Sequence, residues 1–158
     1  MREIARWLMS ALIIVSCVVV VLSGCTKPSD IYGGISKTDF PELTEANLEY
    51  VYQYRGHADN WSAVLFVYKL KGADKFKMKE VLVYTGEDPK PTGQLSTEYT
   101  FGDAVGGSGM LIPEAPENGI YVMLPSLGTK ELLPNTTAKL LVKWGAQSEY
   151  IELKSVPA

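Results

Sequence analysis

The chain has 158 residues, of which 21% are charged, and its formal net charge is −3 at pH 7. This acidic balance does not favour nucleic-acid binding, which requires a basic face, and we expect no nucleic-acid partner. With one histidine and two cysteines, the chain also lacks the ligand set of a tetrahedral transition-metal site, and we expect no cofactor.

Residues 1–24 have the anatomy of a secretory signal peptide. Arg2 and Arg6 precede an apolar stretch, residues 8–22, which contains only two serines. As a helix this stretch would span roughly 22 Å, less than the roughly 30 Å of a bilayer core. We therefore expect residues 1–24 to be cleaved off, and the alternative is an uncleaved N-terminal helix.

The tetrapeptide Leu22-Ser23-Gly24-Cys25 resembles the bacterial lipobox. The resemblance implies that a diacylglyceryl group is attached to the sulfur of Cys25 and that cleavage occurs just before this residue. Two or more acyl chains, such as palmitate, then anchor the protein durably without a spanning segment. Because Cys17 leaves with the signal peptide, no disulfide is expected within the mature chain.

Residues 25–45 are rich in Ser, Thr, Gly, Pro and Asp and show no hydrophobic period. This composition predicts a flexible tether that follows the lipidated cysteine, with a coil dimension of roughly 25 Å. Residues 46–158 remain, which suits a single domain with one core.

Within this domain, short apolar or alternating segments are separated by turn sequences. They predict an all-β, antiparallel, immunoglobulin-like β-sandwich of about seven or eight strands, with an open barrel as the alternative. Residues 61–70 are apolar on both faces and predict a central strand, whereas one helical turn is expected within residues 126–135. The expected strands are 48–55, 61–70, 75–84, 95–101, 108–112, 120–124, 138–144 and 149–153.

Two further segments extend the resemblance from the lipobox to a group of proteins. An Asn-Trp pair leads into an early strand, and a hairpin closes the chain; the matching residues are Asn60, Trp61, Leu141, Val142, Lys143, Trp144, Gly145, Glu149, Ile151 and Leu153. Together these features resemble small, uncharacterised lipoproteins of Gram-positive, Bacillus-like bacteria. The resemblance implies an immunoglobulin-like domain on the extracytoplasmic face of the cell membrane, and no catalytic residue. In a Gram-negative source, Thr26 after the lipidated cysteine favours the outer membrane instead.

The most suggestive candidate contact surface is aromatic. Leu48, Tyr50, Tyr52 and Tyr54 alternate on one face of the first expected strand, and Trp61 begins the next. Such aromatic side chains can stack on sugar rings or anchor a protein partner. On an alternating strand, the simpler interpretation is a face turned to the core, and Trp144 poses the same choice.

Few residues suggest catalysis or metal binding. His57 could be oriented by Asp59 as a general base, but no cysteine or strained serine is available for it to activate. Calcium could be held if Glu87, Asp88 and Asp103 converged, although solvated turn carboxylates are the favoured interpretation. We therefore expect no catalytic residue and no metal site.

These features predict a non-enzymatic binding or interaction module, attached to the membrane through the lipid on Cys25. Its expected partners are an envelope protein or a cell-wall glycan. The alternatives are a small cell-wall hydrolase that uses a carboxylate pair and an accessory subunit of an envelope or transport complex. The ligand and the oligomeric state are left open by the sequence.

Overall fold

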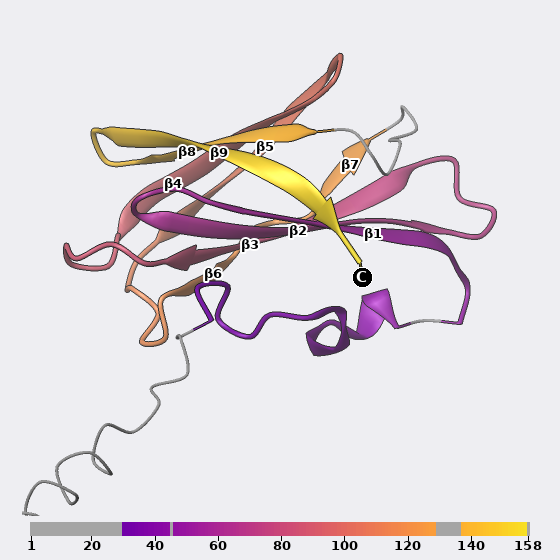
Figure 1. Ribbon diagram of the computed structural model, residues 1–158, viewed down its shortest axis with the longest axis horizontal. Coiled ribbons are helices and arrows are strands. Elements are labelled where there is room, and N and C mark those ends of the chain that lie inside the picture. Colours follow the sequence, from indigo (N-terminus) through magenta and orange to yellow (C-terminus); the bar gives the residue numbers. More distant parts are fainter. Residues whose placement is uncertain (1–29, 45, 129–136, 158) are drawn as a thin grey trace, which may run out of the picture. The chain divides into compact units, whose positions relative to one another are not determined.

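Figure 1 presents the computed structural model of the chain, which describes residues 30–44, 46–128 and 137–157. Two short 3₁₀ helices, Lys37–Asp39 and Pro41–Leu43, precede the strands. The strands are β1 (Leu48–His57), β2 (Trp61–Leu70), β3 (Phe76–Tyr84), β4 (Gly93–Phe101), β5 (Ala104–Ile112), β6 (Ile120–Val122), β7 (Ser126–Gly128), β8 (Ala138–Trp144) and β9 (Gln147–Val156). The predicted signal peptide and Cys25 lie outside the described residues.

The strands form an antiparallel β-sandwich, which confirms the predicted fold class. One sheet contains β1, β2 and β3, with β6 and β7 both paired to β3; the other has the order β5-β4-β8-β9. Strand β9 joins the two sheets, because residues 147–153 pair with β8 and residues 154–156 pair with β1. Figure 1 shows the two sheets as layers, one above the other.

The central position predicted for residues 61–70 is confirmed, since β2 lies between β1 and β3. Its side chains alternate between two apolar clusters, so that both faces are covered. Trp61, Ala63, Leu65 and Val67 enter the main core between the sheets. Val64, Phe66 and Tyr68 enter a second cluster on the opposite face.

The second cluster is closed by the segment predicted as a flexible tether. Ile35, Phe40 and Leu43 are buried against the outer face of β2 and β3, so residues 31–44 belong to the folded unit, which differs from the predicted tether. Lys79 on β3 fixes this segment, because its Nζ donates to Glu42 Oε1 at 2.6 Å and lies 4.6 Å from the Phe40 ring centroid. The hydrogen bond from Lys79 lowers the pKa of the Glu42 carboxyl.

The expected alternation of β1 is interrupted near its start. A bulge between Leu48 and Tyr50 shifts the register with β2, and Leu48 packs in the second cluster together with Val51. Tyr50, in contrast, packs against the main core. Leu48 therefore does not share a face with the tyrosines, contrary to the prediction.

Two glycines explain why the hairpins turn so tightly. Gly102 and Gly145 have φ of 53° and 54°, and each begins a two-residue turn, the first joining β4 to β5 and the second joining β8 to β9. The tight turn lets β5 begin at Ala104, four residues before the predicted start.

After β6, the chain returns to β3 before the second described range ends at Gly128. Residues 126–128, in which part of a helical turn was expected, form strand β7, and residues 129–135 lie outside the described residues. Among the described residues, no helix has the length and apolar character needed to cross a bilayer.

Candidate functional site

The predicted aromatic contact surface is mostly core. Tyr54 and Trp61 are fully buried, with 0% of each side chain exposed, and they cannot touch a ligand in this fold. Trp61 is held by edge-on aromatic contacts with Tyr84, Tyr121 and Trp144, at ring-centroid distances of 5.0, 5.2 and 5.6 Å. The prediction that Tyr54 and Trp61 form part of a contact surface is therefore wrong. Aromatic packing between the sheets removes both side chains from solvent, and their role is structural.

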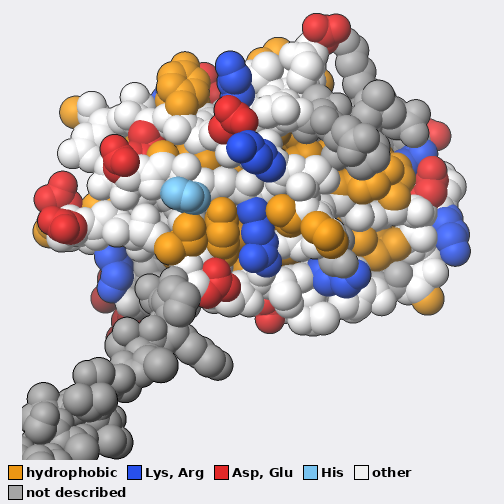
Figure 2. Space-filling view, in the orientation of Figure 1, with side chains coloured by type: hydrophobic (Ala, Val, Ile, Leu, Met, Phe, Trp, Pro, Cys, Tyr) orange, Lys and Arg blue, Asp and Glu red, His pale blue; other side chains and the backbone are white. Residues whose placement is uncertain are grey.

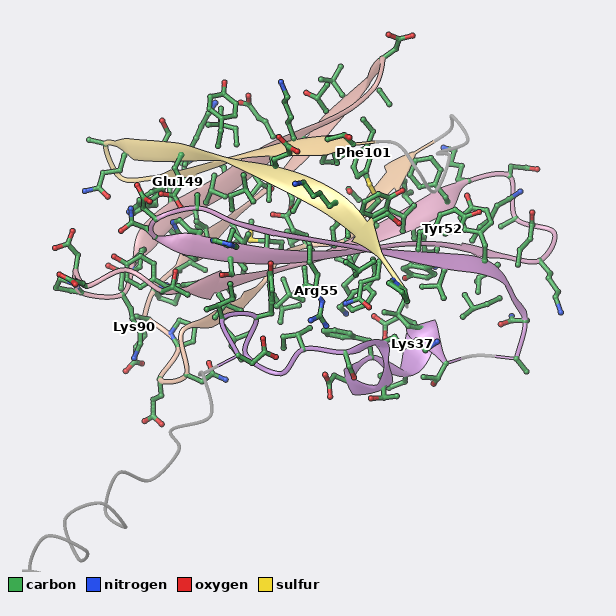
Figure 3. All side chains as sticks on the ribbon, viewed as in Figure 1. Lys37, Tyr52, Arg55, Lys90, Phe101 and Glu149 are labelled. Atoms are coloured by element: carbon green, nitrogen blue, oxygen red, sulfur yellow. The ribbon has the colours of Figure 1, made fainter. Side chains whose placement is uncertain are left out.

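Tyr50 and Tyr52 lie at the edge of the main core. Their rings are stacked on each other, with centroids 4.8 Å apart and an interplanar angle of 15°. Both are half-buried and pack against the core cluster, and Figure 3 labels Tyr52 on the side of β1 that faces the second sheet. One face of each ring is thus already occupied, which leaves less surface for stacking on a sugar than the sequence suggested.

A cationic pocket of about 340 Å³ lies where β9 crosses from β8 to β1. Arg55 and Lys154 are paired in the register of β1 and β9 at this crossing. Gly56 permits the crossing, because a Cβ at this position would collide with the backbone carbonyl of Glu152. The pocket is lined by Tyr32, Arg55, Gly56, His57, Glu152 and Lys154.

The guanidinium of Arg55 is held in place from three directions. Its Nη2 donates to the carbonyl oxygen of Ile35 at 2.7 Å, and its Cζ lies 5.1 Å from the Tyr32 ring centroid. With the amide of Gln53 oriented so that its oxygen faces the guanidinium, this oxygen accepts from Nε at 2.6 Å and from Nη2 at 2.9 Å. Figure 3 shows Arg55 directed from β1 toward the N-terminal segment. The position of the positively charged guanidinium is therefore set by the protein itself, without a ligand.

The other charges of the pocket are more exposed to solvent. Lys154 Nζ and Glu152 Oε1 are 3.9 Å apart, and these side chains are 76% and 59% exposed, so they attract each other only weakly. Figure 2 shows this face, with the single histidine in pale blue near Lys and Arg side chains in blue and hydrophobic side chains in orange. Arginine and lysine donate hydrogen bonds and accept none, so the pocket suits an anionic group.

The structure separates the predicted pair of His57 and Asp59. Both side chains are exposed, no hydrogen bond joins them within the described ranges, and they line different pockets. Asp59 belongs to an open, acidic depression of about 440 Å³ between the β1–β2 turn and the β3–β4 loop. This depression is lined by Asp59, Asn60, Thr85, Gly86, Glu87 and Asp88.

The proposed convergence for calcium does not occur. Glu87 and Asp88 precede β4, whereas Asp103 follows it, so the length of the strand separates them. Among the residues that the structure describes, no group of three or more His, Cys, Asp or Glu side chains is arranged to hold a metal ion. Asn60 is fixed here by Glu149, whose Oε1 and Oε2 accept from the Asn60 backbone nitrogen at 3.1 and 3.2 Å.

The sequence did not lead us to predict Glu80 as a buried ionisable residue. Glu80 shares the inward face of β3 with Phe76 and Met78 and is 4% exposed, in the main core between the sheets. Burial raises the pKa of its carboxyl to about 7. An acidic residue that alternates with large apolar residues was the available indication.

Comparisons of the chain with protein-family models, with curated proteins and with solved structures find no match. The described residues define an antiparallel β-sandwich with a cationic pocket at the strand that joins its two sheets.

Proposed function

We propose that this chain is a lipid-anchored, extracytoplasmic binding module, and that its cationic pocket takes an anionic group of an envelope component. The observation that carries this proposal is the fixed guanidinium of Arg55 beside the exposed ammonium of Lys154. A preorganised cation loses little conformational entropy on binding, which favours recognition of a carboxylate or a phosphate.

The predicted anchor supports the same function. The lipobox-like residues at Leu22–Cys25, and the resemblance to Bacillus-like lipoproteins, favour attachment at the extracytoplasmic face of the cell membrane. Tyr32, which lines the pocket, follows Cys25 by only seven residues. A chain of this length reaches at most about 25 Å. Carboxylate and phosphate groups on cell-wall glycans or lipid headgroups would lie within this range of a protein anchored through Cys25.

Anion titration tests the pocket directly. The full chain in detergent micelles would be titrated with inorganic phosphate and with acetate, and binding would be followed by amide chemical shifts. We expect shifts that centre on Arg55 and Lys154, and weaker binding in Lys154→Ala. The matched control is Lys71→Ala, because Lys71 is also exposed but follows the far end of β2. Equal binding by both variants, or shifts spread over unrelated lysines, would contradict the proposal.

The acidic depression favours one second candidate, a cell-wall hydrolase that uses a carboxylate pair. It brings Asp59 together with Glu87 and Asp88 from another loop. Zymography on peptidoglycan and polysaccharide separates the two functions. The binding module predicts no lysis, whereas lysis that disappears in Asp59→Asn or Glu87→Gln would establish the hydrolase.

A further inference from the structure

Among the residues that the structure describes, strand β5 is an edge strand whose own sequence lacks the usual protection. It ends the strand order of its sheet and pairs only with β4 in the described part of the chain. Natural edge strands avoid pairing with other chains through charged side chains, proline, bulges or short length. Strand β5 has nine residues, AVGGSGMLI, with neither charge nor proline, and its register with β4 is continuous from Ala104 to Ile112. At the opposite end of the order, β6 has only three residues.

The turn before β5 determines which backbone groups point away from β4. A two-residue turn closes the hairpin with a hydrogen-bonded pair, here Phe101 and Ala104. Hydrogen-bonded and non-hydrogen-bonded pairs then alternate along the ladder. The N–H and C=O groups that face outward therefore belong to alternate residues, namely Val105, Gly107, Gly109 and Leu111.

These four residues are accessible. Val105 and Leu111 are 78% and 74% exposed, and Gly107 and Gly109 are also exposed. The neighbouring residue Ser108 contacts the rest of the chain, because its hydroxyl donates to the carbonyl of Leu124 at 3.0 Å. Leu124 is itself 59% exposed and adds apolar surface beside the edge.

The outward residues are arranged symmetrically about Ser108, in the order apolar, glycine, glycine, apolar. From this symmetry we propose that β5 pairs antiparallel with β5 of a second copy of this chain, on a twofold axis at Ser108. In this register Val105 lies opposite the partner's Leu111, and Gly107 lies opposite the partner's Gly109. The two four-stranded sheets then form one continuous sheet across the dimer.

This pairing satisfies the requirements of a twofold interface. All outward N–H and C=O groups of the four residues find partners, and each end gains an apolar cross-strand pair. No charged side chain of β5 opposes its copy, and the carboxylate of Glu98, which lies opposite Gly107 on β4, is already paired with Lys143. A general peptide partner would need a matching uncharged, extended segment, whereas a second copy supplies it automatically. The interface uses none of the pocket residues and does not depend on the proposed anion binding.

Register-specific disulfide cross-linking tests the dimer. Val105→Cys and Leu111→Cys would be made separately in the full chain, with Cys17→Ser and Cys25→Ser, so that each protein has one thiol. Opposite residues of a hydrogen-bonded pair have Cα atoms about 5.5 Å apart, which a disulfide can bridge. We expect rapid disulfide formation in the mixture of the two proteins, and at least about tenfold slower formation in either protein alone. No cross-link in the mixture, or equally fast cross-linking of one variant with itself, would overturn the pairing.

A charge substitution provides the second test and does not depend on thiols. In the double variant Val105→Lys/Leu111→Lys, lysines would oppose lysines at both ends of the interface. Both native side chains are exposed, so folding should be preserved. We expect self-association, measured by sedimentation of the full chain, to weaken at least about tenfold.

The matched control adds the same charge to the same face. Gln94→Lys/Thr100→Lys places two lysines on β4, opposite Leu111 and Val105 and one strand away from the edge, at exposed positions. This variant should keep most of the self-association. If both variants associate as the original chain does, or if both lose association equally, edge pairing through β5 is excluded.

Discussion

Thr97 of β4 donates a hydrogen bond to Glu80 of β3 at 3.0 Å, and this bond crosses the interior from one sheet to the other. The other carboxyl oxygen of Glu80, Oε1, has no hydrogen-bond partner among the described residues. A buried carboxylate with one unsatisfied oxygen is costly, so the protonated form is favoured in the folded state.

This burial predicts that stability falls as the pH rises. Desolvation raises the pKa of Glu80 from 4.5 to about 7, while the hydrogen bond from Thr97 partly opposes the shift. Above pH 4.5, the ordinary pKa of this carboxyl, the unfolded chain releases the proton that the folded chain retains. For this group, stability is greatest below pH 4.5, and about 3 kcal/mol is lost progressively as the pH rises from 4.5 through about 7.

Glu80→Gln removes this titration. Urea unfolding at pH 5 and pH 8 should show a much smaller difference for Glu80→Gln than for the original chain. The control is Glu98→Gln, which removes a carboxylate that is exposed on the neighbouring strand β4. If Glu80→Gln retains the full pH dependence, the assignment to Glu80 is wrong.

Gly56 should tolerate no side chain. Gly56→Ala places a Cβ against the carbonyl of Glu152, at the point where β9 joins the two sheets. We expect a loss of about 2–4 kcal/mol in the free energy of unfolding, or failure to fold. Gly109→Ala is the control, because its Cβ would make only an ordinary contact, 3.5 Å from Ser96. Equal stability of the two variants in urea would contradict the close approach of Gly56 to the Glu152 carbonyl where β9 crosses to β1.

The N-terminal segment should contribute to stability. Leu43 is almost fully buried beneath β2 and β3, so Leu43→Ala should cost about 2–5 kcal/mol in denaturant unfolding. Ile31→Ala, an apolar truncation at an exposed position of the same segment, should cost less than about 1 kcal/mol. An unchanged stability of Leu43→Ala would restore the interpretation of this segment as a free tether.

Chemical modification should distinguish core from surface aromatics. Tyr150, which is 72% exposed on the second sheet, should be modified first, and Tyr54 should resist. Burial also raises the pKa of Tyr54, which reduces its reactive phenolate form. Mass spectrometry after selective tyrosine labelling measures the order. Modification of Tyr54 as fast as Tyr150 would show that the first strand is not packed as described.

Much of the fold could be predicted because the strands follow simple hydrophobic patterns. The continuous apolar run of 61–70 indicated a central strand, and the alternation around Phe76 indicated β3. The start of β5 was missed because glycine is rare in strands, and its glycines were assigned to a loop. Here Tyr99 lies directly over Gly106 and covers the missing side chain, a contact between strands that no local pattern records.

The candidate site was harder to predict, because it depends on contacts between distant segments. Arg55 reaches Ile35 and Tyr32 across the N-terminal segment, and Lys154 arrives from the last strand. That segment was predicted as a tether because Ile35, Phe40 and Leu43 are too widely spaced to show a period. Their burial depends on the apolar outer face of β2, which only the assembled sheet provides.

We propose that the chain is anchored through lipid on Cys25, and the mass of the mature protein tests this proposal most directly. Intact-mass and N-terminal peptide analysis of membrane fractions should find a chain that begins at Cys25 and carries acyl groups. Cys25→Ser should remain unlipidated and keep residues 1–24. A membrane-associated protein that retains its first 24 residues, or a mature Cys25 without lipid, would contradict the account.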